Sequence, residues 1–220
     1  SVGYPQIVEA AVASQLDAIA ITDHNTATGI DEIRSIASGK GLVVFPGMEL
    51  TTKSGHFLAI FDIDTPVARL QQLLDDMGVK PALRGDGAEP IPGETLDVLQ
   101  KVHDYGGLVI AAHIERWPSG FLESKESRAV KAAIHASSCL HALEITVAQN
   151  RASWENGLVR GYDKKYACVQ GSDAHTPAEI GRRPVYLRLP VINLVSLQTV
   201  FQKWQGNIAF SEKEFENGIY

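Results

Sequence analysis

The sequence predicts an α/β fold with one hydrophobic core, built as a barrel or as a wound sheet. Strand-like and helix-like segments alternate along the chain, which is typical of repeated β/α units. Four of the strand-like segments are short apolar runs, as expected of parallel strands that are covered on both faces. The chain has 220 residues, 45% of them hydrophobic and 21% charged, which is ordinary for one globular domain. We therefore expect residues 1–220 to form a single domain.

The individual elements follow from spacing and from turn residues. Pro5 suits the first turn of a helix, and Gly39 suits the end of another. Apolar residues at helical spacing predict helices at residues 5–14, 31–37, 67–77, 95–105, 126–136 and 194–204. Short apolar runs predict buried parallel strands at residues 16–21, 42–45, 108–112 and 167–170, and further strands at 55–60, 142–147, 185–189 and 208–210. Residues 78–93 are rich in glycine and proline and predict a loop or lid.

Composition and charge argue against several classes of protein. The apolar runs are far shorter than the roughly 20 residues that cross a bilayer, and the N-terminus lacks a basic segment followed by an apolar core. We therefore expect a cytoplasmic protein with no membrane partner. The formal net charge of −6 argues against a surface built for non-specific nucleic-acid binding. Cys139 and Cys168 lie in apolar surroundings and are expected to be buried reduced thiols.

Six side chains of metal-binding type lie in four short apolar stretches, each after a predicted strand. They are His24 in I-T-D-H-N, Glu49 and His56 in P-G-M-E-L-T-T-K-S-G-H, His113 in A-A-H, and Asp173 and His175 in G-S-D-A-H. The carboxyl ends of parallel strands meet at one rim, so residues far apart in the sequence can converge there. Imidazole and carboxylate are ligands of zinc, manganese and iron. The six residues therefore predict a metal site, whereas His103, His135 and His141 lack the pattern and predict structural or surface roles.

Local spacing suggests how these ligands are arranged. Asp173 and His175 are separated by one residue, so in an extended chain both side chains point to the same face. Glu49 can bridge two cations through its two oxygens, and His56 can return beside it on the next strand after the T-T-K-S-G turn. Asp23, next to His24, points the other way or supports the cluster through hydrogen bonds.

Together these motifs resemble the PHP (polymerase and histidinol phosphatase) family over nearly the whole chain. The resemblance implies a distorted (β/α)7 barrel with up to three zinc, manganese or iron ions, which hydrolyses phosphoesters through a metal-bound hydroxide. The implied metal ligands are His24, Glu49, His56, His113, Asp173 and His175, with Glu49 bridging. The stretch G-S-D-A-H-T-P-A-E-I-G-R-R is also similar to PHP domains found beside ATPase modules, which suggests a larger protein partner.

The chain departs from the family at its start. Family members begin with a strand that ends in H-x-H and supplies further ligands, and no such motif is present here. We expect that this first strand was truncated, cleaved or disordered, so that residues 1–220 are an N-terminally incomplete PHP domain; natural degeneration is the alternative. In this chain the set of Glu49, His56 and His113 would be complete, while the other two metal positions would lack ligands.

The predicted reaction assigns a role to several further residues. Glu49, Asp173 and His175 are expected to serve catalysis through the metals. Arg182 and Arg183 could grip a phosphate bidentately, although a surface ion pair is an equal alternative. Arg116 and Trp117 could line the substrate pocket, with Trp117 offering a face for base stacking; packing is the alternative.

Three functions remain open from the sequence. The first is a phosphatase or phosphodiesterase acting on a phosphorylated small molecule or nucleotide, favoured by the acidic charge. The second is a nuclease acting on DNA or RNA ends, which needs a basic channel from elsewhere. The third is a degenerate, non-catalytic module of a larger assembly. A metal-dependent amide hydrolase is disfavoured, because it rests on fold and ligand type alone.

Overall fold

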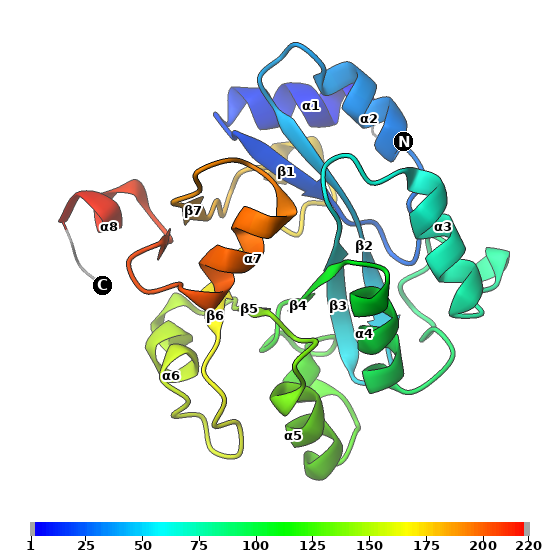
Figure 1. Ribbon diagram of the computed structural model, residues 1–220, viewed down its shortest axis with the longest axis vertical. Coiled ribbons are helices and arrows are strands. Elements are labelled where there is room, and N and C mark those ends of the chain that lie inside the picture. The colour runs from blue at the N-terminus through cyan, green and yellow to red at the C-terminus, as the bar shows by residue number, and fades with distance from the viewer. Residues whose placement is uncertain (1–2, 218–220) are drawn as a thin grey trace.

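The computed structural model describes residues 3–217, and its centre is a curled sheet of six strands in sequential order (Figure 1). The strands are β1 (Ala18–Ile21), β2 (Val43–Thr52), β3 (Gly55–Ile60), β4 (Leu108–Ala111), β5 (Ala142–Glu144) and β6 (Ala167–Val169). A separate pair, β7 (Tyr186–Leu187) and β8 (Ile208–Ala209), is antiparallel. The arrangement confirms the predicted α/β class and has the form of a distorted, partial (β/α) barrel.

The direction of the strands differs from the sequence prediction at one place. Strands β1 and β2 pair in parallel, as do β4 with β5 and β5 with β6. Strand β3 is antiparallel to both β2 and β4, because it returns from β2 through a tight turn. The same hairpin extends β2 to Thr52, so Glu49 and His56 lie inside strands and not beyond the end of one. The prediction that every ligand follows a parallel strand is therefore wrong for these two residues.

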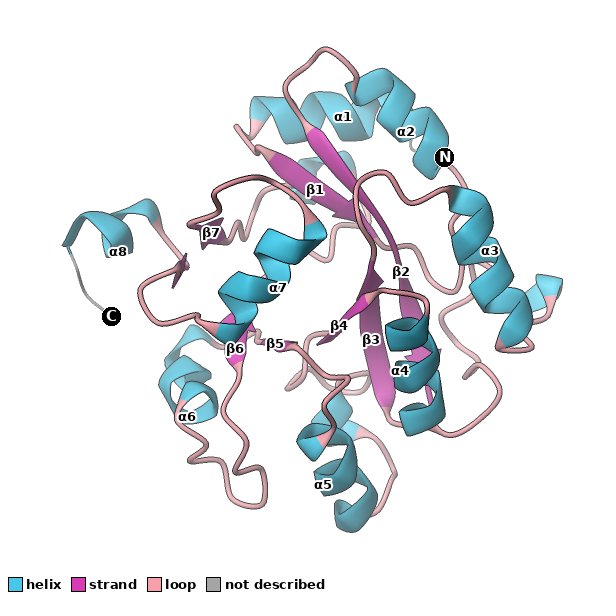
Figure 2. Ribbon diagram, viewed as in Figure 1, coloured by secondary structure: helices cyan, strands magenta, loops and turns pink. Residues whose placement is uncertain are grey.

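The helices surround the sheet (Figure 2). They are α1 (Tyr4–Ala13), α2 (Ile30–Ala37), α3 (Val67–Asp76), α4 (Thr95–Asp104), α5 (Arg128–Ala136), α6 (Arg151–Glu155), α7 (Leu194–Gln202) and α8 (Glu212–Asn217). The six predicted helices are confirmed to within two residues, while the short helices α6 and α8 were not predicted. Residues 78–93 form the predicted loop, with a single 3-10 turn at Pro81–Leu83.

The core has two parts, one on each face of the sheet. Neighbouring residues Val44 and Phe45 of β2 belong to different parts, as the alternation of side chains along a strand requires. The smaller part lies under α7, where Val200 and Phe201 pack with Phe45 and with residues of β4 and β6. Both faces of the strands are thus covered, which explains why the strands read as continuous apolar runs.

Two further expectations concern the cysteines and the membrane. Cys139 and Cys168 are buried free thiols, as predicted, and burial raises the pKa of the Cys168 thiol above its usual range. Within residues 3–217, no helix has the length and apolar character needed to cross a bilayer.

Candidate metal centre

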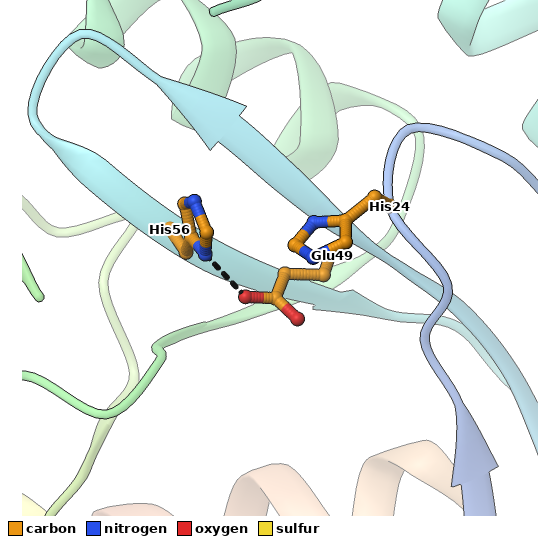
Figure 3. A group of neighbouring side chains, drawn as sticks. All are labelled: His24, Glu49 and His56. Carbon is orange, nitrogen blue, oxygen red and sulfur yellow. Dashed lines mark hydrogen bonds and ion pairs between the residues drawn. The ribbon is translucent and has the colours of Figure 1, made fainter. Parts of the chain in front are cut away.

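Three of the predicted ligands, His24, Glu49 and His56, form one cluster (Figure 3). Each offers a ligand atom, and these atoms lie within 4.8 Å of one another. The backbone places His24 beside Glu49, because Asn25 N donates to Glu49 O at 2.9 Å and Glu49 N donates to Asp23 O at 3.1 Å. The β2–β3 hairpin then returns His56 to the same place, as the sequence predicted. Three segments of chain thus converge on one carboxylate.

His113 joins this cluster through Glu49. Glu49 Oε1 lies 2.6 Å from His56 Nδ1 and 3.1 Å from His113 Nε2. Glu49 is 7% exposed and His113 is 2% exposed. Burial by itself would raise the pKa of Glu49, but the hydrogen bonds from His113 and His56 and the charges of His56 and His24 outweigh it and hold the pKa well below its usual range. The carboxylate is therefore an anion surrounded by imidazoles.

This donor set fits a divalent cation. One carboxylate and three imidazoles are a combination that zinc, manganese and iron accept. His113 Nδ1 is buried without a hydrogen-bond partner among the described residues, so one nitrogen of this ring is unused. A divalent cation here would be attracted by the buried Glu49 anion and could bind the imidazole nitrogens.

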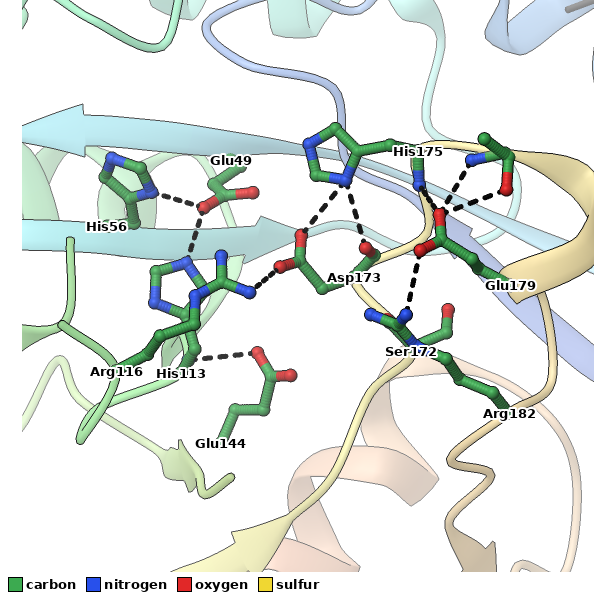
Figure 4. Close-up of polar contacts among 11 residues, drawn as sticks. Glu49, His56, His113, Arg116, Glu144, Ser172, Asp173, His175, Glu179 and Arg182 are labelled. Carbon is green, nitrogen blue, oxygen red and sulfur yellow. Dashed lines mark hydrogen bonds and ion pairs between the residues drawn. The ribbon is translucent and has the colours of Figure 1, made fainter. Parts of the chain in front are cut away.

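Asp173 and His175 lie next to this cluster but outside its 4.8 Å group (Figure 4). His175 Nδ1 lies 3.1 Å from Asp173 O and 3.9 Å from Asp173 Oδ1. The prediction that an extended backbone directs both side chains to one face is wrong, because Asp173 has a φ of 47°, in the left-handed region. The two residues approach each other through this turn instead, with the His175 side chain 71% exposed.

The three arginines that were predicted to bind substrate make contacts within the protein. Arg116 forms an ion pair with Asp173. Arg182 donates to Ser172 O at 2.8 Å and to Glu179 Oε1 at 2.8 Å. Arg183 donates to Ile145 O at 2.5 Å. All three therefore hold the loops around Asp173, and their role toward a substrate stays a prediction.

Other predicted residues are placed by their exposure. Trp117 is 77% exposed, so the alternative of a packing role is wrong. Asp23 is exposed, and its backbone carbonyl rather than its side chain supports Glu49. His135 is 2% exposed and packs among aromatic rings, away from the cluster, in agreement with a structural role.

The sequence missed one contributor to the site and left the place of a second, predicted as a loop or lid, open. Glu144, at the end of β5, is 4% exposed, and its Oε2 accepts a hydrogen bond from His113 N at 3.1 Å. A carboxylate inside the apolar run 142–147 was the signal that could have identified it. The loop 78–93 is the other: Gly85 N donates to His24 O at 2.8 Å, and Asn25 Nδ2 donates to Asp86 O at 2.8 Å. This loop forms a wall of the centre.

Comparison with solved structures agrees with this geometry. Endonuclease Q from Pyrococcus furiosus, a lesion-specific endonuclease, has a TM-score of 0.67 and 14% identity, over 90% of this chain and 50% of that chain. Endonuclease Q in complex with a 27-mer duplex bearing an abasic lesion has a TM-score of 0.68 and 15% identity, over 94% of this chain and 53% of that chain. This chain shares its fold with these endonucleases.

A bacterial structure supports the same fold. A protein of Bifidobacterium adolescentis assigned as a metal-dependent phosphoesterase has a TM-score of 0.53 and 18% identity, over 79% of this chain and 82% of that chain. The domain spans about half the length of Endonuclease Q. No protein-family profile and no curated protein sequence matches the chain.

Proposed function

We propose that this PHP-type domain is a metal-dependent phosphoesterase that hydrolyses phosphomonoesters or phosphodiesters. The observation that carries the proposal is the Glu49 carboxylate, buried and ionised between His56 and His113, with His24 in the same cluster. The fold shared with Endonuclease Q and with the bifidobacterial protein supports the same reaction class.

The proposed metal ligands are the six residues predicted from the sequence. Glu49, His56 and His113 would form one set, because Glu49 Oε1 already contacts both rings. His24, Asp173 and His175 would contribute ligands to further positions, for up to three metal ions in total. Zinc, manganese and iron all suit these donors. When bound, such cations lower the pKa of water and neutralise the charge of a phosphate.

The protein's own residues would supply position and charge. Glu49 lies in β2 and His56 in β3, so the hairpin register fixes their separation without a flexible loop. The depressed pKa of Glu49 keeps its oxygens free of protons at neutral pH, as a ligand requires. Arg116, with Arg182 and Arg183 nearby on the loop that follows Asp173, would bind the substrate's phosphate oxygens.

The substrate class follows from charge. The net charge of −6 favours a phosphorylated small molecule or a nucleotide over a long polyanion. A cytoplasmic location and an ATPase or other protein partner stay predictions from the sequence.

A nuclease is the second candidate. Two observations favour it: the fold is shared with Endonuclease Q, which was solved with a DNA duplex, and Trp117 presents a ring that is 77% exposed, on which a base can stack. Incubation with end-labelled single-stranded and duplex DNA would distinguish the candidates. Cleavage that is lost in Trp117→Ala, with hydrolysis of small esters retained, would favour the nuclease.

The decisive experiment compares Glu49→Ala with Glu94→Ala. Glu94 is an exposed carboxylate paired with Lys53, so its loss tests for general effects of removing a charge. Metal content by elemental analysis and hydrolysis of 4-nitrophenyl phosphate and bis(4-nitrophenyl) phosphate with added manganese are the readouts. We expect metal and turnover in the wild type and in Glu94→Ala, and neither in Glu49→Ala. Metal without turnover in the wild type would favour a non-catalytic module, and a wild type without metal would overturn the proposal.

A further inference from the structure

The Arg116–Asp173 ion pair joins two loops that border the metal centre. Arg116 lies in the turn after β4, three residues beyond His113, and Asp173 lies in the loop after β6 (Figure 4). The Asp173 side chain is 15% exposed, whereas the Arg116 side chain is 40% exposed. The guanidinium therefore reaches from the solvent side onto a carboxylate that the sequence assigns to a metal.

The backbone that carries Arg116 is tightly held. Arg116 N donates to His113 O at 2.8 Å, and Gly120 N donates to Arg116 O at 2.6 Å. A Cβ at Gly120 would lie 2.6 Å from Arg116 O and 2.7 Å from His113 O, so only glycine allows this close turn. Because the backbone of Arg116 is fixed, this residue can respond to a cation at Asp173 only by moving its side chain, which is long and partly solvated.

A divalent cation and a guanidinium compete for the same carboxylate. A cation with two charges attracts Asp173 more strongly than Arg116 does, and it repels the guanidinium at short range. Arg116 has no second acidic partner among the described residues, since Asp173 is the one carboxylate with which it forms an ion pair there. Once displaced, its side chain would stay at the rim of the centre.

We propose that Arg116 is a metal-responsive positioning residue: it holds Asp173 in the metal-free protein, and a divalent cation at Asp173 releases it to bind the substrate's phosphate. This inference rests on the proposed function and adds an order of events, in which metal binds first and phosphate second. The released guanidinium presents parallel N–H donors that match two phosphate oxygens. Competition for Asp173 would in this way couple metal loading to substrate affinity.

The test measures binding without turnover. Isothermal titration of Arg116→Gln with Mn²⁺ alone, and with inorganic phosphate at saturating Mn²⁺, gives two affinities. We expect Mn²⁺ to bind about threefold to tenfold more tightly than in the wild type, since an ion pair of this exposure contributes about 1 kcal/mol. We expect phosphate to bind at least about tenfold more weakly, because a charge-assisted pair is lost.

The control is Arg34→Gln, which removes an arginine–aspartate pair on α2, with Asp31 at 3.6 Å. Both affinities should be unchanged in this variant. Circular dichroism confirms that each variant is folded.

Asp173→Asn gives a second line of evidence. It releases Arg116 without metal, so its affinity for phosphate in the absence of Mn²⁺ should exceed that of the wild type.

Three results would overturn the proposal. Weaker or unchanged Mn²⁺ binding by Arg116→Gln would show that the ion pair supports the metal site or has no effect on it. Unchanged phosphate affinity in Arg116→Gln would contradict the release step, and so would unchanged metal-free phosphate affinity in Asp173→Asn. If the expected affinities are found but no ester is hydrolysed, the proposed function fails while the competition for Asp173 stands.

Discussion

Gly87 and His24 are in contact across the wall of the metal centre. A Cβ built on Gly87 would lie 2.7 Å from both Cδ2 and Nε2 of the His24 ring, closer than a side-chain carbon ever approaches such atoms. The loop that carries Gly87 is anchored at His24 and at the next residue, because Gly85 N donates to His24 O and Asn25 Nδ2 donates to Asp86 O. The loop thus fixes where the imidazole can lie.

Gly87→Ala should therefore displace His24 and weaken metal binding. We expect Mn²⁺ affinity to fall about tenfold, since a small misplacement of one ligand removes about 1.4 kcal/mol of binding energy. Ala88→Ser, at the next and exposed position, is the matched control and should bind as the wild type does. Equal affinities in all three proteins would show that the loop yields without moving His24.

Glu144 should matter for the metal centre, whereas Glu115 should matter only for stability. Glu144 accepts from His113 N, while Glu115 accepts from Trp154 Nε1 at 2.9 Å and from Asn150 Nδ2 at 2.7 Å. Glu144→Ala leaves one donor without its partner and Glu115→Ala leaves two, at a cost of about 1–3 kcal/mol for each donor. We expect both variants to unfold at lower urea concentration, and only Glu144→Ala to lose Mn²⁺ affinity. A loss of affinity in Glu115→Ala as well would mean that general loosening is the cause.

His135 should make stability depend on pH. Burial lowers its pKa to about 4, and its Nε2 has no hydrogen-bond partner among the described residues. The unfolded chain therefore binds the proton more readily, so protonation destabilises the fold as pH falls from about 6.5 toward 4. We expect the free energy of unfolding to drop by on the order of 2 kcal/mol across this window because of His135.

The variant His135→Phe isolates that contribution. Its surroundings, Trp154, Tyr162 and Tyr166, are aromatic and accept a ring of similar size. Urea unfolding at several pH values gives the free energy of unfolding as a function of pH. Between pH 4 and 6.5 this free energy should change less steeply with pH in the variant than in the wild type. Identical slopes would assign the pH dependence to other groups.

Substitution of an exposed and of a buried tryptophan should change the free energy of unfolding by very different amounts. Trp117 is 77% exposed and Trp154 is 1% exposed. We expect Trp117→Ala to change the free energy of unfolding by less than about 0.5 kcal/mol, and Trp154→Ala to lower it by about 3–5 kcal/mol. A large loss in Trp117→Ala would show that its ring packs in solution and is not available to a ligand.

Much of the fold was predictable because apolar runs and helical spacing report local burial directly. The runs at residues 16–21 and 167–170 became β1 and β6, and the spacing through residues 67–77 became α3. The return of β3 beside β2 was predicted from the T-T-K-S-G turn, whereas its antiparallel pairing with β4 was not, because an apolar strand reads the same in either direction. The extension of β2 to Thr52 was not predicted, and it places Glu49 within a strand and not after the end of one.

The candidate site was likewise predictable only in part. Residue types and strand ends were sufficient to select His24, Glu49, His56 and His113, since imidazoles and carboxylates beside buried strands are rarely tolerated without a function. Side-chain directions at Asp173 were missed, because its left-handed backbone depends on contacts made by the whole loop and not on its immediate neighbours.

The choice of ligand types and the positions of the buried strands were thus encoded locally, in residues close together along the chain. The tertiary structure decided what lies against those ligands: Gly87 on His24, Glu144 under His113, and Arg116 on Asp173. Each of these pairs is separated by more than 30 residues, as the numbering shows. Periodicity records whether a residue is buried but carries no information on its distant partner, and such partners are set by how the elements pack.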